Sequence, residues 1–175
     1  RTCEAGRFRA GARAGRGPAG KSKEIPGEKI VGRSLPGLIG WIALSFLAAA
    51  VGGLFRPGEW YLSLDRPAWP PPASIFPPVW TVLYAMMGVA AWLAWKARGW
   101  RAGAAPLAIF VVQLLLNAAW SWLFFGLHRP GLALFDIVAL WIGILATVIA
   151  FWRVRPAAGV LLIPYLAWVS FAVFL

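Results

Sequence analysis

Five long apolar runs, almost free of charge, constrain this chain more than any other feature of its sequence. They cover residues 35–55, 75–95, 102–127, 131–152 and 156–175. A bilayer core of about 30 Å requires about 20 apolar residues in a helix that rises 1.5 Å per residue. Each run is therefore long enough to cross a membrane, and we predict an all-α membrane protein.

The connectors between these runs are only a few residues long, except for the one between the first and second runs. Short connectors make neighbouring helices antiparallel, so residues 34–175 are predicted to form one five-transmembrane-helix bundle.

Hydrophobic residues make up 61% of the 175 residues and charged residues 13%, which is unlike a soluble globular domain. A single Cys and a single His exclude a disulfide framework and a Cys/His metal cluster within one chain, so we expect no metal site.

Residues 1–33 differ from the rest, with nine Lys or Arg and three Glu among Gly and Ala. Such a basic, weakly apolar extension is expected to be disordered. Three interpretations stay open: a juxtamembrane tail, an organelle transit peptide, or an upstream extension absent from the mature protein. The net charge of +11 comes largely from this segment. No nucleic-acid-binding motif accompanies it, so we expect no nucleic-acid partner.

Basic residues also predict the orientation of the bundle. One side would carry fourteen Lys or Arg, counting the tail and the second and fourth connectors, whereas the other side would carry Arg56, Arg66 and Arg129. The positive-inside rule then places the N-terminus inside and, with five spans, the C-terminus outside. The sequence does not indicate which membrane houses the protein.

The long connector between the first two spans is unusual. From Trp60 to Trp80 it holds three tryptophans and six prolines. Proline fixes φ and disfavours regular structure, so we expect a stiff, irregular lid over an outward-facing mouth, through which a ligand would enter.

Polar and aromatic side chains recur at helical spacing inside the spans. The stripes are Trp80 and Tyr84 in the second span, Gln113, Asn117, Trp120 and Phe124 in the third, and Tyr165, Trp168 and Ala172 in the fifth. Asn117 could simply bind a neighbouring helix, or it could line a cavity beside Trp120. Asp136 is the one acid inside a span. Its role is either functional, as for most acids at membrane depth, or structural, since it lies close to a helix start and to water. A cavity walled by indoles suits a large planar apolar ligand such as a porphyrin or a sterol.

Several sequence segments resemble the TspO/MBR family, the tryptophan-rich sensory proteins related to the mitochondrial translocator protein. The resemblance rests on three segments: Trp60-Tyr61 with Arg66-Pro67-Ala-Trp69-Pro and Phe76-Pro-Pro-Val-Trp80, then Gln113 to Gly126, then Pro164-Tyr165-Leu-Ala-Trp168. It covers residues 35–175 in order. Two positions depart from many relatives, which have Trp in place of Ser74 and Gly in place of Pro77.

The resemblance implies a five-helix protein, commonly a homodimer, that binds porphyrins such as protoporphyrin IX and in some members sterols. The ligand-binding residues it implies are Tyr61, Trp69, Trp80, Tyr84, Asn117, Trp120, Trp168 and Ala172. The sequence ends at Leu175, before the tail in which animal relatives recognise sterols, so that motif is not carried over.

We therefore expect a porphyrin sensor or carrier in the lipid bilayer, with no obligatory cofactor and no catalytic residue. Because the only histidine, His128, lies in a connector, metal-free porphyrin is favoured over haem. Two alternatives remain: light-dependent porphyrin degradation, in which the pigment supplies the chemistry, and transport of tetrapyrroles or sterols across the membrane.

Overall fold

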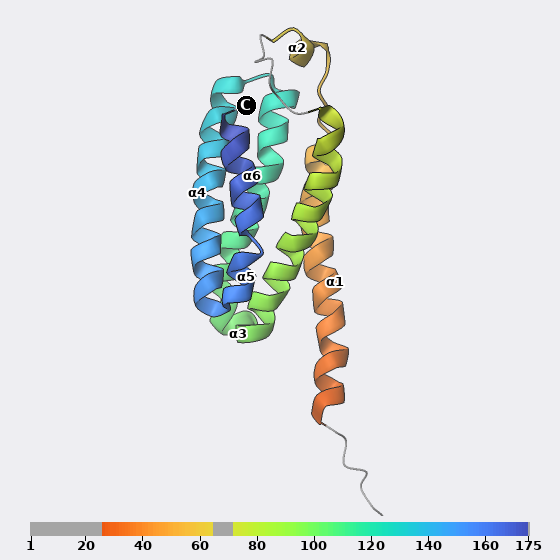
Figure 1. Ribbon diagram of the computed structural model, residues 1–175, viewed down its shortest axis with the longest axis vertical. Helices are drawn as coiled ribbons and strands as arrows, with labels where there is room; N and C mark the ends of the chain where they lie inside the picture. The colour runs from red at the N-terminus through yellow and green to blue at the C-terminus, as the bar shows by residue number, and fades with distance from the viewer. Residues whose placement is uncertain (1–25, 65–71, 175) are drawn as a thin grey trace, which may run out of the picture.

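The computed structural model describes residues 26–64 and 72–174, and the regular elements in these ranges are all helical (Figure 1). Predictions that concern residues 1–25 and 65–71, including the position of Trp69, lie outside the described residues. The helices are α1 (Pro26–Gly53), α2 (Glu59–Leu62), η1 (Ala73–Ile75), α3 (Phe76–Ser121), η2 (Trp122–Gly126), α4 (Pro130–Val154), α5 (Pro156–Val160) and α6 (Ile163–Val173).

The first span starts at Leu35 as predicted, but the helix that contains it starts earlier. Its apolar part is Leu35–Gly52, but α1 already begins at Pro26, so residues 26–33 are helical rather than disordered. Proline suits the first position of a helix, where its missing N–H would have no partner in any case. The end of the connector is helical as well, because Pro77 and Pro78 lie in the first turn of α3.

The second and third spans form one helical hairpin. The apolar helical stretch from Ala73 to Gly126 is 54 residues long, and it is interrupted at Gly99, where φ is 68° and ψ is −168°. Hydrogen bonds join Tyr84 to Asn117 and Gln113 to Met87, so the two halves of α3 run antiparallel. Figure 1 shows the helix turning back at one end of the bundle.

The third span ends in a π-helical turn, and the fifth span is broken. In η2 the N–H of Leu127 donates to the carbonyl of Trp122 at 2.8 Å, which widens the turn. The fifth span was predicted as one helix over 156–175, but α5 and α6 are separated by a turn at Leu161 and Leu162. Pro164 explains the break, because it has no N–H to continue the α-helical ladder.

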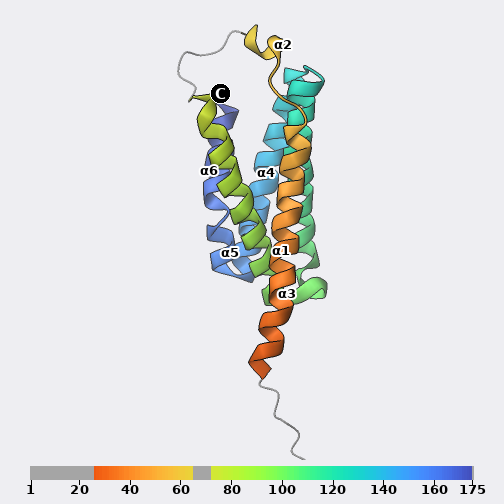
Figure 2. The same cartoon turned by 90° about the vertical axis from the view of Figure 1, so that its right-hand side faces the viewer.

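The prediction of an all-α, multi-pass membrane protein is confirmed. Four apolar helical stretches are long enough to span a membrane, and the one reversed at Gly99 crosses twice, so the described residues make five crossings. Large apolar side chains such as Phe135, 78% exposed, face outward where lipid would cover them. Figures 1 and 2 show α2 and the C-terminus at the same end, called here the lid end; the opposite end is the turn end.

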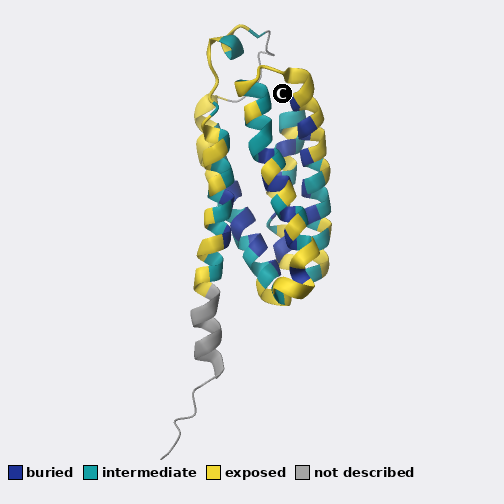
Figure 3. Cartoon of the chain, turned by 180° about the vertical axis from the view of Figure 1, so that it is seen from behind, coloured by how far each residue is buried: buried dark blue, intermediate teal, exposed yellow. Residues whose placement is uncertain are grey.

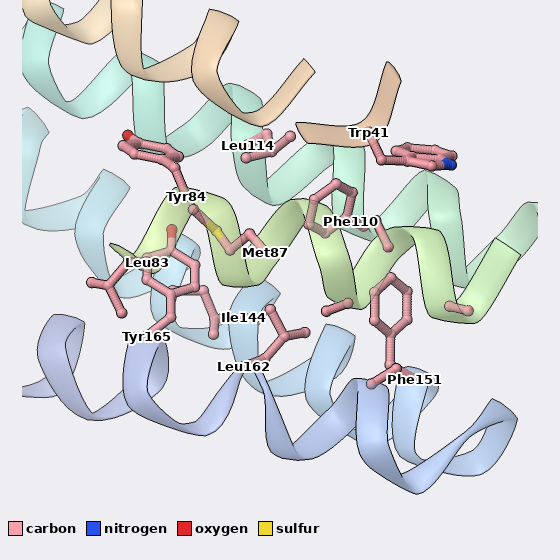
Figure 4. Packing of buried hydrophobic residues seen from close by; sticks show 14 of the residues in the cluster. Trp41, Leu83, Tyr84, Met87, Phe110, Leu114, Ile144, Phe151, Leu162 and Tyr165 are labelled. Atoms are coloured by element: carbon pink, nitrogen blue, oxygen red, sulfur yellow. The ribbon is translucent and has the colours of Figure 1, made fainter. Parts of the chain in front are cut away.

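The hydrophobic core is densest away from the lid. In the first half of α3 the residues near the lid are exposed or half-buried, those between Leu83 and Ala94 are mostly buried, and those at the turn are again exposed, as at the yellow end of the bundle in Figure 3. In the core, Phe110 stacks on Phe151 at 5.7 Å between ring centroids, and Trp41 meets the edge of Phe110 at 6.0 Å (Figure 4). The side chains of the bundle are thus more buried away from the lid than beneath it.

Candidate functional site

A chain of hydrogen bonds joins three spans in the middle of the bundle. The Tyr84 hydroxyl donates to Oδ1 of Asn117, and Nδ2 of Asn117 donates to the Tyr165 hydroxyl at 3.0 Å. The Tyr165 hydroxyl in turn donates to Oε1 of Gln113 at 3.1 Å. We call these four residues the polar network. All four are buried, so their bonds replace the water that the bilayer cannot supply.

Each member of the polar network is positioned by its helix. Gln113 and Asn117 lie one turn apart on α3 and therefore share a face. Tyr84 comes from the antiparallel half of α3, and Tyr165 reaches across from α6, as Figure 4 shows for the two tyrosines. Three crossings are thereby fixed in rotation relative to one another.

Trp80 extends the polar network toward the lid end. Its ring centroid lies 5.4 Å from that of Tyr84, one turn away on α3, and 6.1 Å from that of Tyr165. Trp168, one turn beyond Tyr165 on α6, packs against the edge of Phe76 at 5.7 Å. Both indoles are only half-buried, so part of each ring remains accessible.

A second group of rings closes the bundle beneath α2. Trp120 stacks on Phe124 at 5.1 Å with an interplanar angle of 8°, and Phe125 meets Phe124 at 5.0 Å. From α2, Trp60 approaches Phe124 at 5.6 Å and Tyr61 approaches Phe125 at 5.5 Å. We call these five residues the aromatic cap. The π-helical turn places Phe124 and Phe125 side by side under the lid.

The structure brings four of the eight predicted site residues into these two groups. Tyr84 and Asn117 are in direct contact, and Trp80 packs on Tyr84. Tyr61 and Trp120 lie in the aromatic cap, which joins the polar network because Trp120 is one turn from Asn117. Trp168 and Ala172 are half-buried against the core from the α6 side. Trp69 lies outside the described residues. The role of all eight residues in ligand binding stays a prediction.

Two residues of the polar network, Tyr165 and Gln113, are not among the predicted ligand-binding residues. Tyr165 is 1% exposed and bonds to both amides of α3, and Gln113 completes the polar network. Both belong to the helical stripes of the sequence. Their spacing from Asn117 and Trp168 was the available signal, but only the relative rotation of α3 and α6 shows that they meet.

The position of Asp136 near a helix start predicted that its side chain would lie close to water. In the structure the side chain is buried instead. Its side chain is 9% exposed, and its Oδ2 atom has no hydrogen-bond partner among the described residues. No cluster of three or more His, Cys, Asp or Glu side chains that could hold a metal occurs in residues 26–64 and 72–174. The side chains that meet in the polar network and the aromatic cap are rings, amides and hydroxyls.

Comparison with known proteins gives a consistent result. The family model of the TspO/MBR family matches residues 41–175. A tryptophan-rich protein TspO of Chlorobaculum tepidum is 44% identical over 141 residues, covering 77% of this chain and 87% of that protein. A translocator protein of Bos taurus is 40% identical over 139 residues, covering 77% and 82%. A tryptophan-rich sensory protein of Cereibacter sphaeroides is 40% identical over 134 residues, covering 74% and 83%.

Proposed function

The chain belongs to the TspO/MBR family, and on that premise we propose that it binds porphyrins such as protoporphyrin IX in the membrane as a sensor or carrier. The ligand would lie between the connector that carries α2 and the second, third and fifth spans. It would contact Tyr61, Trp69, Trp80, Tyr84, Asn117, Trp120, Trp168 and Ala172.

One observation carries this proposal: three indoles around the polar network are half-buried, whereas the rings deeper in the core are buried. Trp80, Trp120 and Trp168 each keep accessible ring surface while packing on the core. A planar apolar ligand can stack on such faces, and each offset-stacked ring pair contributes about 0.5–1.5 kcal/mol beyond the area it buries. Ligand sites are typically apolar walls with a few convergent polar groups, which matches this arrangement.

The polar network would orient the ligand. Asn117 uses one lone pair of Oδ1 and one hydrogen of Nδ2 in the bonds to Tyr84 and Tyr165. An amide can make further bonds through its second lone pair and its second N–H. Asn117 is therefore held rigidly and can still bind a polar group at the edge of a porphyrin ring, which supports its assignment as an orienting residue.

We propose that the favoured ligand is metal-free. Axial ligation of haem iron commonly uses a histidine enclosed in the pocket. His128 is the only histidine of the chain; it is exposed at the lid end, with its ring 4.5 Å from that of Trp60. This placement supports protoporphyrin IX over its iron complex, and titration with both compounds would compare them.

Tryptophan fluorescence tests the proposed site. Protoporphyrin IX should quench the fluorescence of the purified protein in mild detergent, and the double variant Trp120→Ala, Trp168→Ala should bind at least about tenfold more weakly because it loses two stacking faces. Unaltered affinity in this variant would overturn the proposed pocket.

A matched variant controls for the loss of two indoles as such. Trp100 and Trp152 lie near the turn end and are 63% and 48% exposed, so Trp100→Ala, Trp152→Ala should bind with the affinity of the wild type. Size-exclusion chromatography would verify that both double variants remain folded and monodisperse. An equal loss of affinity in both would indicate a general effect of tryptophan removal.

Transport is the second candidate function, because relatives from several mammals are named translocator proteins. Flux of a tetrapyrrole or sterol across proteoliposomes that contain this chain would support it.

We also propose that the chain forms a homodimer and that its N-terminus lies inside. Light-dependent porphyrin degradation would be recognised by product formation that is lost in Trp80→Phe or Trp120→Phe.

A further inference from the structure

Two apolar grooves flank Pro164 on the outer surface of the bundle. One, of about 540 Å³, lies between Ile75 and the α6 residues Pro164, Ala167 and Trp168. The other, of about 330 Å³, lies between Pro164 and the α3 residue Val82 with its neighbours Val79 and Met86. Both follow the boundary between the first half of α3 and α6, which we call the α3–α6 seam.

The α3–α6 seam is closed by side chains. Two aromatic pairs bridge it: Phe76 with Trp168 at 5.7 Å, and Trp80 with Tyr165 at 6.1 Å. On its other side α6 is held more firmly, because the indole N–H of Trp141 in α4 donates to the Ser170 hydroxyl at 2.8 Å. The described side-chain contacts across the seam are thus ring contacts, whereas a hydrogen bond joins α6 to α4.

The grooves lead directly to the candidate site. Trp168 is a wall of the larger groove and is also one of the half-buried indoles of the site. Tyr165, one turn below it on α6, bonds to Asn117 and packs on Trp80. Trp168 therefore belongs both to the wall of the larger groove and to the rings that surround the polar network, and its neighbour Phe76 packs against it there.

Rings also pack closely at the lid end, in the part of it that the structure describes. There the rings of the aromatic cap pack on one another across α2 and η2, at centroid distances of 5.5 and 5.6 Å. An apolar planar molecule also concentrates in the bilayer, where it meets the exposed groove residues Ala167 and Val82 without passing through water.

We propose that the α3–α6 seam is the entrance for the ligand, that the grooves around Pro164 are its landing site on the bilayer side, and that Trp168 and Phe76 form the gate. The occupant is a planar, apolar molecule dissolved in the membrane. This inference rests on the proposed porphyrin-binding function and replaces entry through the lid with lateral entry.

A blocked groove tests the entrance. Ala167→Trp would place an indole in the larger groove and leaves all eight candidate ligand-binding residues unsubstituted. In lipid nanodiscs, stopped-flow quenching by protoporphyrin IX should show association and dissociation slowed by about tenfold, with the equilibrium constant unchanged within about twofold, because an obstruction on the path changes both rates equally. Ala139→Trp is the matched control: it adds the same ring at an exposed position of α4 and should bind as fast as the wild type.

The possible results distinguish a failure of the proposed entrance from a failure of the proposed porphyrin-binding function. Binding by Ala167→Trp at the wild-type rate and affinity would overturn the seam as the entrance and leave the porphyrin site intact. Absence of quenching in the wild-type protein would overturn the proposed function and the entrance with it. If Ala167→Trp does not fold, Val82→Trp, at a 57% exposed position in the smaller groove, tests the same path with the same expected slowing.

Discussion

The Asn117 side chain binds two phenols that come from different helices, and this single amide fixes how three spans face one another. Tyr84 donates to its oxygen and Tyr165 accepts from its nitrogen. In a bilayer interior these groups have no water as an alternative partner. The same residues that shape the candidate site therefore also stabilise the bundle.

Removing one hydroxyl from the polar network should destabilise the protein in proportion to the bonds it makes. Tyr165→Phe breaks two bonds, to Asn117 and Gln113, and leaves both amides buried with one partner fewer. We expect a loss of about 1–2 kcal/mol in unfolding free energy, measured by SDS titration in mixed micelles. Tyr84→Phe breaks one bond and should cost less; a larger loss for Tyr84→Phe than for Tyr165→Phe would contradict this account.

At this scale the sequence predicted part of the site. Helical spacing was sufficient to place Gln113 and Asn117 on one face of a span, because that depends on a single helix. It was not sufficient to pair Asn117 with Tyr84 and Tyr165, since that depends on the rotation and depth of three helices. The burial of Asp136 was missed for the same reason: distance from a helix start does not tell which neighbour covers a side chain.

The number of membrane crossings followed from the apolar runs, but the starts and interruptions of the helices did not. The run length needed to cross a bilayer predicted all five crossings, and short connectors predicted their antiparallel order. The break before Pro164 interrupts the α-helical hydrogen bonds, while α5 and α6 both remain packed on α4. Its position therefore depends on tertiary packing, which hydropathy does not report. The helical start of α1 at Pro26 lies outside the apolar run, so hydropathy carried no signal for it.

The reversal of α3 depends on one glycine. Gly99 adopts φ 68° and ψ −168°, a region open almost only to glycine, while a Cβ added there would meet no atom within 4 Å. Gly99→Ala should therefore cost about 1–3 kcal/mol through backbone strain alone, visible as a lower midpoint in thermal unfolding. Gly40→Ala, on a helix with equally open space, should keep or raise the midpoint. Equal effects of the two substitutions would show that the reversal does not require glycine.

At the scale of the whole molecule, five of the seven basic side chains that the structure describes lie at the turn end. Lys96, Arg98 and Arg101 follow the first half of α3, and the connector after α4 carries Arg153 and Arg155. Arg98 donates to the carbonyl of Arg153 at 3.4 Å, so the two connectors are adjacent. The acidic residues whose side chains are described, Glu59 and Asp136, lie elsewhere, on α2 and inside α4. The charge asymmetry seen in the sequence is thus also an asymmetry between the two ends of the folded bundle.

This asymmetry predicts that the turn end faces the inside, since positively charged connectors are retained there. The test uses Cys3→Ser as background, because Cys3 is the only cysteine of the chain. A membrane-impermeant maleimide on intact cells should label Gly131→Cys, exposed at the lid end, and should label Ala97→Cys, exposed at the turn end, only after permeabilisation. The reverse pattern would place the lid, the aromatic cap and the C-terminus inside. Deleting residues 1–33 should leave the orientation unchanged, because the remaining connectors still carry five basic residues against three.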